Sequence, residues 1–273
     1  MSTLTSDAST DARSRPRLSQ IEAAARSSDR LTRSAVVACA GKGGTGKSTI
    51  LTSLAAYLAE NAEVVLVDLD IDNASALRWQ LLRREVGDVP VVTVVAPEVD
   101  ELAADALGRS VELADAAGGP SVVLVDLPGR PRRDLSTELW QQLDLVYVPL
   151  EATLMVTGAT VRLLDGYRQD GTHGPVVRPI INRWSAERRM KEAVTALGDG
   201  IVAPVSVRAY VAHGDAYAAG LGVTEYCTEH KSADDIRRLA ADMRGTLRGI
   251  SKVRRNGQRW TGEFAPMRGM HDA

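Results

Sequence analysis

The sequence predicts an α/β fold, a doubly wound, mostly parallel sheet flanked by helices. Two observations lead to this prediction. Apolar, β-branched runs take turns along the chain with longer helix-like segments, and the apolar runs are continuous rather than interrupted by polar residues. Continuous runs are typical of strands buried on both faces of a parallel sheet. The chain of 273 residues is long enough for one large domain of this kind.

Strands and helices are expected in turn along the chain. The strands are expected at residues 35–39, 64–67, 91–95, 122–125, 145–148 and 176–181. The helices are expected at residues 49–59, 74–84, 99–107, 136–143, 156–168 and 186–197. The spacing of apolar residues predicts a last helix at about 233–251, with one face formed by Ile236, Leu239, Met243, Leu247 and Ile250. We interpret it as a helix packed on the sheet. Because it also carries Arg237, Arg238, Arg244 and Arg248, a membrane-surface helix is the alternative.

Three segments follow from these patterns. Residues 1–33 are rich in Ser, Thr, Asp, Ala and Arg and are expected to form a disordered polar tail. Residues 34–251 form the α/β domain, and residues 252–273 form a basic C-terminal tail that contains glycine.

Composition narrows the function classes. The net charge of −2 shows no overall excess that would attract nucleic acid, so such binding would need a local basic patch. Cys39 lies in a predicted buried strand and is expected to be an inert core residue. With Cys227 far away, the chain has no disulfide framework and fits the reducing cytoplasm.

A glycine-rich loop follows the first strand and precedes a helix, and it matches the P-loop pattern G-x-x-x-x-G-K-[ST]. Its backbone N–H groups and the following helix N-terminus are suited to phosphate. Lys47 is expected to reach the β- and γ-phosphates, and Ser48 to offer its hydroxyl to Mg²⁺. The nucleotide-binding residues are expected to be Gly41, Gly43, Gly44, Thr45, Gly46, Lys47, Ser48 and Thr49.

Acidic residues end two of the predicted strands. Asp68, Asp70 and Asp72 follow the second strand, and Asp126 follows the fourth in the apolar-run-plus-acid pattern of a Walker B segment. Asp126 is therefore expected to hold Mg²⁺, often through water. The alternative is that the first group of acids caps the next helix, with Asn73 or Asp72 as the N-cap.

Several segments together resemble the ParA/MinD ATPases, most of all the ParA-type partition proteins. Residues 42–48, Lys-Gly-Gly-Thr-Gly-Lys-Ser, resemble their deviant Walker A motif KGGxxGK[ST]. Residues 64–70 resemble their Walker A′ segment, although Ile71 and Asp72 stand where Pro-Gln is usual. Residues 180–183, which include Asn182, resemble their adenine-site strand end, and residues 204–226 resemble their later block with its closing Glu-Tyr.

The resemblance implies roles for individual residues. Lys42 crosses a dimer interface to the partner's phosphates, and the alternative is a solvated lysine on an exposed loop. Asp70 orients the attacking water, with Asp68 as its companion and Asp72 as a rival. Asn182 recognises adenine. Arg130, Arg132 and Arg133 lie where the family has a nucleotide-sensing switch.

The resemblance also implies a function. ATP and Mg²⁺ are the expected cofactors, and slow hydrolysis of ATP to ADP and phosphate is stimulated by a ParB-like partner. The ATP-bound homodimer binds nonspecific DNA, associates with the nucleoid, and segregates or positions a plasmid, a chromosome or a protein assembly. Candidate DNA contacts are Arg183, Arg188, Arg189, Arg208, Arg237 and Arg238.

Three alternatives stay open. The candidate arginines could instead form ion pairs within the chain, for example with Glu187 or Asp234. A MinD-like positioning ATPase would bind a membrane rather than DNA, although the residues after the last helix weigh against membrane binding. An enzyme that uses ATP to activate a small substrate is the third.

Overall fold

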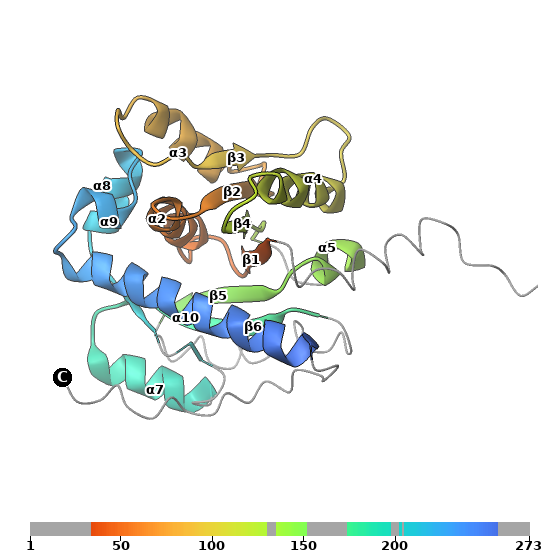
Figure 1. Ribbon diagram of the computed structural model, residues 1–273. Helices are drawn as coiled ribbons and strands as arrows, with labels where there is room; N and C mark the ends of the chain where they lie inside the picture. The colour runs from red at the N-terminus through yellow and green to blue at the C-terminus, as the bar shows by residue number, and fades with distance from the viewer. Residues whose placement is uncertain (1–33, 130–134, 152–173, 198–201, 204, 256–273) are drawn as a thin grey trace, which may run out of the picture. The chain divides into compact units, whose positions relative to one another are not determined.

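Seven parallel strands form one sheet in the described part of the chain, which the computed structural model covers over residues 34–129, 135–151, 174–197, 202–203 and 205–255 (Figure 1). The sheet order is β3-β2-β4-β1-β5-β6-β7. The strands are β1 (Ala35–Cys39), β2 (Glu63–Asp68), β3 (Thr93–Val95), β4 (Ser121–Asp126), β5 (Leu145–Glu151), β6 (Val176–Trp184) and β7 (Val207–Arg208). The predicted fold class is confirmed.

Helices connect the strands and cover the sheet. They are α2 (Lys47–Ala59), α3 (Ser75–Arg84), α4 (Ala103–Asp115), α5 (Thr137–Gln141), α7 (Glu187–Leu197), α8 (Ala212–Ala218), α9 (Val223–Tyr226) and α10 (Lys231–Arg255). The helix expected at residues 156–168 and the arginines at 130, 132 and 133 lie outside the described residues.

One predicted helix is misplaced. Residues 99–107 are expected to be helical, but α4 begins at Ala103 and continues to Asp115. Val99 is 94% exposed and Leu102 is 69% exposed, so these two apolar residues do not belong to a buried helix face. Leu102 has the extended backbone of a residue that precedes a helix.

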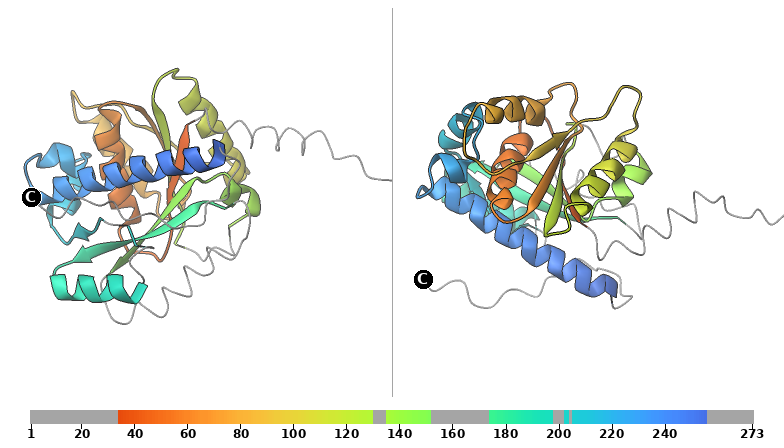
Figure 2. Two further views of the ribbon diagram at one scale, coloured as in Figure 1. Left: turned by 60° about the horizontal axis from the view of Figure 1, so that its bottom comes forward. Right: turned by 45° about the horizontal axis from the view of Figure 1, so that its top comes forward.

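The strands are buried on both faces because helices cover both. Val37 and Cys39 pack into a core with α2, α9 and α10, whereas Val36 and Ala38 pack into a second core with α4, α5 and α7. Figure 2 shows the sheet between α2 and α10 on one side and α4 and α5 on the other. This arrangement explains why the strands read as continuous apolar runs.

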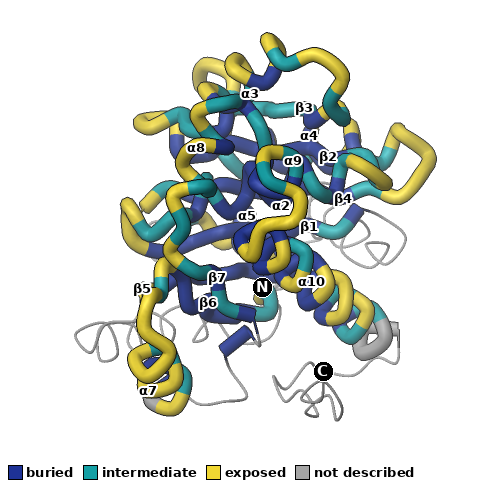
Figure 3. Tube along the Cα trace, turned by 90° about the vertical axis from the view of Figure 1, so that its left-hand side faces the viewer, coloured by how far each residue is buried: buried dark blue, intermediate teal, exposed yellow. Residues whose placement is uncertain are grey.

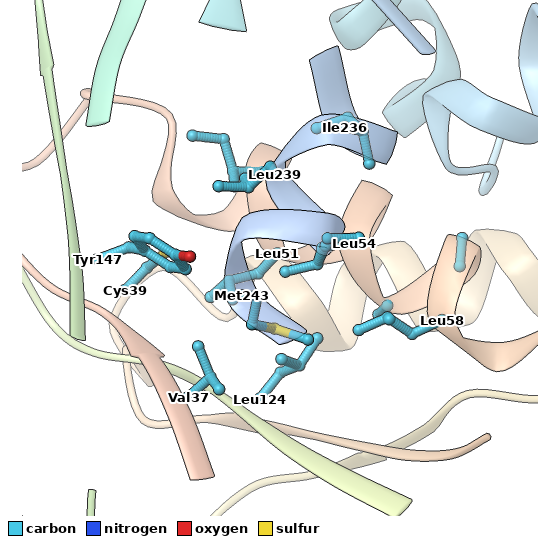
Figure 4. Close-up of a cluster of buried hydrophobic side chains, with 14 of the residues drawn as sticks. Val37, Cys39, Leu51, Leu54, Leu58, Leu124, Tyr147, Ile236, Leu239 and Met243 are labelled. Atoms are coloured by element: carbon cyan, nitrogen blue, oxygen red, sulfur yellow. The ribbon is translucent and has the colours of Figure 1, made fainter. Parts of the chain in front are cut away.

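The apolar face of α10 packs inside the molecule. Ile236, Leu239 and Met243 are buried against α2, close to Leu51 and Leu54 (Figure 4). The interpretation of this helix as a C-terminal element packed on the sheet is therefore confirmed. No helix among the described residues combines the length and apolar character needed to cross a membrane.

A buried polar network fixes α10 to the sheet. The Asp242 carboxylate accepts hydrogen bonds from Arg178 Nη1 of β6 and from the Tyr147 hydroxyl of β5, both at 2.7 Å. Arg178 Nη1 also donates to Thr246 Oγ1 at 2.9 Å. Burial, followed by the Asp242 charge, raises the pKa of Tyr147 well above its ordinary value, so this hydroxyl stays a donor.

A second buried ion pair joins α3 to α9. Arg83 donates to both carboxylate oxygens of Glu225, at 2.9 and 2.7 Å. Their side chains are only 5% and 13% exposed. Glu225 also accepts the Gly222 N–H at 2.8 Å, and the Arg83 guanidinium lies 5.0 Å from the Trp79 ring. The pair therefore links an early and a late part of the chain.

Candidate nucleotide site

The P-loop lies at the point where the strand order of the sheet reverses. β1 has β4 on one side and β5 on the other, and the loop leaves the carboxyl end of β1 and enters α2 at Lys47. Ligands of open α/β sheets bind in the crevice beyond the strand ends at this kind of position. The order of elements thus places the loop where a nucleotide is expected.

Glycine is required within the loop. Gly46 has φ of 92° and Gly44 has φ of 79°, in the left-handed region that other residues rarely adopt. A β-carbon on Gly46 would also lie 2.5 Å from Asn182 Nδ2. The backbone shape therefore disfavours a side chain at Gly46, and a β-carbon there would also displace the Asn182 amide from the loop.

The two lysines of the loop differ in exposure. Lys47 is 5% exposed and begins α2, whereas Lys42 is exposed. The Lys42 carbonyl accepts a hydrogen bond from Thr45 Oγ1 at 2.9 Å. Lys47 is thus placed at the start of α2, where a phosphate is expected, and Lys42 is open to solvent.

Three neighbouring strands end together beside the loop. Asp126 of β4 is the register partner of both Cys39 of β1 and Asp68 of β2. Cys39 is buried, and burial raises its thiol pKa, so it matches the predicted inert core residue. The aligned strand ends place the carboxylates of Asp68 and Asp126 at the edge of the sheet from which the P-loop leaves.

Asp126 is fully buried, and neither of its carboxylate oxygens has a hydrogen-bond partner among the described residues. Burial raises the pKa of Asp126 to about 7, and the nearby charges of Asp68 and Asp70 add to the rise. The Ser48 hydroxyl and Lys47 lower this pKa in part, although Ser48 does not reach hydrogen-bonding geometry. A cation would remove the cost of this buried charge.

These residues fit Mg²⁺. The ion prefers oxygen ligands and keeps several waters, so it needs few protein groups when phosphate oxygens are present. Ser48 and the unsatisfied carboxylate of Asp126 would hold it, and the ion would supply charge neutralisation between the phosphates. Ser48 and Asp126 are the two residues that the sequence predicts as magnesium ligands.

Asp68 holds the start of α3. Its Oδ2 accepts the N–H groups of Ala76 and Leu77 at 2.8 and 3.1 Å, and its Oδ1 accepts the Asp70 N–H at 3.2 Å. Burial raises the pKa of Asp68, and these three donors partly offset the rise. An acid thus does cap the helix, but it is Asp68, whereas the N-cap position itself is taken by Ala74 rather than by Asn73 or Asp72.

Asp70 and Asp72 are in different environments. Asp70 is buried, and its two carboxylate oxygens accept Asn73 Nδ2 at 3.1 and 3.0 Å. Asp72 is exposed. The held and buried carboxylate is better suited to orient a water molecule, so Asp70 stays the preferred candidate over Asp72.

Asn182 and Arg183 meet the P-loop from the end of β6. Asn182 Nδ2 donates to the Thr45 carbonyl at 2.6 Å, and Arg183 Nη1 donates to the Gly44 carbonyl at 2.7 Å. The sequence predicts adenine recognition for Asn182, and this contact shows that its amide nitrogen is already engaged by the loop. The contact of Arg183 with the loop has no sequence signal.

Gly129 is a further site residue that sequence reasoning missed. A β-carbon at Gly129 would lie 2.9 Å from the Gly43 nitrogen and 3.2 Å from the Gly43 Cα. The segment after β4 therefore packs directly on the P-loop backbone, which only glycine permits. In the sequence, a glycine three residues after the strand-end Asp126 is the feature that could have predicted this close approach.

The candidate DNA-binding arginines lie at one end of the sheet, on β6, α7, β7 and the start of α10. Arg208 and Arg238 both donate to Asp235, each at 2.6 Å, and Arg237 pairs with Asp234 at 3.0 Å. Arg183 also lies 3.6 Å from Glu151, so ion pairing within the chain, the open alternative, occurs for five of the six once the contact of Arg188 with Glu192 is included. Glu187 pairs with Lys191 rather than with an arginine. Arg188 is 87% exposed and lies 3.5 Å from Glu192, and the neighbouring Arg189 is also exposed.

Because Asp126 is buried, replacing it with a neutral residue should stabilise the protein, and the gain should depend on pH. Without nucleotide or Mg²⁺, Asp126→Asn should unfold at a higher temperature than the wild type at pH 8. Because the folded-state pKa of about 7 lies above the ordinary 3.8, the wild type loses stability as pH rises through this range. The difference in unfolding free energy between Asp126→Asn and the wild type should reach at most about 4 kcal/mol above pH 7 and shrink toward pH 4.

Thermal unfolding at pH 5 and pH 8 measures this gap. Glu60→Gln, which removes an exposed charge, is the control and should match the wild type at both pH values. A gap of equal size at pH 5 and pH 8 would show that Asp126 does not titrate as described.

Comparison with known proteins agrees with this geometry. Residues 36–254 match the family model of the CobQ/CobB/MinD/ParA nucleotide binding domain. The chain belongs to this family. The ParA/MinD ATPase family predicted from the sequence is thereby confirmed for this chain.

Relatives of this ParA/MinD-family chain include a curated protein and solved structures. Maintenance of carboxysome distribution protein A of Gloeobacter kilaueensis is 30% identical over 211 residues, which are 74% of this chain and 90% of the relative. The ParA family ATPase of Chlorobium tepidum TLS superposes with a TM-score of 0.57 at 18% identity, over 77% of this chain and 98% of that one. MinD in the MinC:MinD complex of Aquifex aeolicus superposes with a TM-score of 0.62 at 17% identity, over 78% and 96%. The two structures share the fold of this ParA/MinD-family chain.

Proposed function

We propose that this chain is an ATPase that dimerises with ATP and positions or segregates a cargo through nucleotide-controlled binding to nonspecific DNA. The observation that carries the proposal is the meeting of the P-loop, the unsatisfied Asp126 carboxylate and the buried Asp70 at one strand edge. These groups supply a phosphate cradle, a Mg²⁺ ligand and a candidate to orient water, which are the parts that phosphoryl transfer to water needs.

Dimerisation follows from the loop lysines. Lys47 is buried beside its own phosphate site, whereas Lys42 is exposed. In the proposed dimer Lys42 meets the partner's nucleotide, where a cation stabilises charge that develops in the transition state. Hydrolysis then depends on dimerisation, and slow hydrolysis can be accelerated by a ParB-like activator.

In this proposal α7 is the main DNA-binding element. This helix is exposed along most of its length (Figure 3), and Arg188 and Arg189 lie on it. Arg208, Arg237 and Arg238 are held by acids, so they contribute less. A dimer doubles the basic surface, which makes DNA binding dependent on ATP.

The cargo is a plasmid, a chromosome or a protein assembly. The name of the 30% identical relative concerns carboxysome distribution and supports a positioning role. A membrane-bound, MinD-like function finds less support, because the apolar residues Ile236, Leu239 and Met243 that would enter lipid are buried against α2.

Gel shifts with random-sequence duplex test the proposal. We expect a shift at low salt with Mg-ATP, a weaker one without nucleotide, and a log–log salt slope of about −0.9 for each phosphate contact. The double variant Arg188→Ala/Arg189→Ala should lower the magnitude of this slope by about 1 for each lost contact. Arg84→Ala, an exposed arginine of α3, is the control. No shift in either nucleotide state would exclude the DNA role.

A further inference from the structure

Two adjacent side chains of β6 hold two consecutive carbonyl groups of the P-loop. Arg183 Nη1 donates to the Gly44 carbonyl at 2.7 Å, and Asn182 Nδ2 donates to the Thr45 carbonyl at 2.6 Å. Both peptide groups lie in the part of the loop that precedes Lys47. The conformation of the loop is therefore fixed by side chains of β6, which lies one strand beyond β5, as well as by its own glycines.

These contacts set the direction of two backbone N–H groups. In a trans peptide the C=O and N–H bonds point to opposite sides. When β6 holds the carbonyls of Gly44 and Thr45, the N–H groups of Thr45 and Gly46 are turned away from β6. Successive N–H groups facing one side form an anion-binding concavity. A loop free to rotate these peptides would present carbonyl oxygens to phosphate in part of its population.

An irregularity in β6 makes the double contact possible. In a regular strand, successive side chains point to opposite faces. The register with β7 shifts between Asn182 and Trp184, which leaves Arg183 as the extra residue of a bulge. Bulges redirect side chains and are frequent beside active sites. The bulge therefore lets both Asn182 and Arg183 reach the loop.

The backbone of Arg183 is strained. Its φ is 53°, in the left-handed region, where a residue with a β-carbon is disfavoured. Glu151, the register partner of Asn182, lies 3.6 Å from Arg183 Nη1 and favours the charged side chain at this position. Glycine would remove the backbone strain, so the presence of arginine needs a reason in its side chain.

We propose that Arg183 is a positioning residue of the nucleotide site, which presets the Gly44–Thr45–Gly46 peptides to bind the phosphates of a nucleoside triphosphate. It acts through the loop carbonyl and does not touch the substrate itself. The inference deepens the proposed function at its ATP site. It is independent of DNA, although Arg183 is also one of the candidate DNA contacts.

The test compares nucleotide affinity with stability in the same variants of the full chain. Binding of a fluorescent ATP analogue with Mg²⁺ is titrated without DNA, and thermal unfolding is measured without nucleotide. Arg183→Ala and Arg183→Gly should each weaken binding about tenfold. Arg183→Lys, which keeps a donor, should recover most of this loss. Arg84→Ala, which removes an exposed arginine of α3 with no assigned role, should bind like the wild type.

Arg183→Gly separates positioning from structural support. Because glycine relieves the left-handed strain, this variant should unfold at a higher temperature than the wild type while it binds nucleotide more weakly. Opposite changes in the two measurements support the proposal. Wild-type affinity in both Arg183→Ala and Arg183→Gly overturns it, and so does a parallel loss of affinity and stability in Arg183→Gly.

The proposed function fails in a different way. If the wild type binds nucleotide but never shifts DNA, the DNA role falls and the assignment of Arg183 is still decided by the affinities. If Arg183→Ala loses DNA binding at unchanged nucleotide affinity, Arg183 is a DNA contact and the positioning role is overturned.

Discussion

Replacing Lys47 by alanine should abolish ATP binding, with a loss of affinity of at least about a hundredfold. Lys47 is 5% exposed at the first position of α2, where its cation would meet phosphate in a site largely closed to water. Charge-assisted hydrogen bonds are strongest in such surroundings. Titration with a fluorescent ATP analogue in the presence of Mg²⁺ measures the effect.

Two controls accompany the Lys47→Ala variant. Lys231→Ala removes an exposed lysine at the start of α10 and should leave the affinity unchanged. Thermal unfolding shows whether Lys47→Ala is folded. A folded Lys47→Ala that binds the analogue like the wild type would refute the P-loop assignment.

Replacing Glu225 by alanine should cost about 3–5 kcal/mol of folding free energy. The change leaves the Arg83 guanidinium, which is 5% exposed, without its carboxylate partner, and it also removes the acceptor of the Gly222 N–H. A buried charge that loses its partner is far more costly than a missing surface pair. Denaturant unfolding at neutral pH measures the difference.

Glu187→Ala is the matched control for this stability prediction. Its ion pair with Lys191 is about two-thirds exposed on both sides, so the unfolding midpoint should stay close to that of the wild type. In the double variant Arg83→Met/Glu225→Ala the loss should be smaller than the sum of the two single losses. Additive losses would mean that the two side chains do not stabilise each other.

The parts of the fold that sequence could predict are those governed by local pattern. β1 appears over the predicted residues because a continuous apolar run precedes the glycine loop, and α2 begins close to its predicted start for the same reason. β7, with two residues, has no periodicity to read. α8 and α9 are also short, and tertiary contacts help to hold them in place, as the ion pair of Arg83 with Glu225 does for α9.

The same distinction applies to the candidate site. Asp68 and Asp126 could be placed at one edge because parallel strands bring their carboxyl ends together, and their register agrees. The contact of Arg183 with Gly44 depends on a bulge that pairs residues 182–184 with a strand more than twenty residues later. No local pattern encodes that pairing. Asp68, rather than Asp72, accepts the first N–H groups of α3, and this contact also depends on where the helix lies in space.

The burial of Cys39 has a practical consequence for labelling. Thiol reagents attack the thiolate, and burial both shields Cys39 and raises its pKa. Cys227, the other of the two cysteines, is partly exposed in the turn before α10. A maleimide dye therefore selects Cys227 in the unmutated chain, close in sequence to Arg237 and Arg238. Its fluorescence provides an optical readout of events at that end of the sheet without any engineered cysteine.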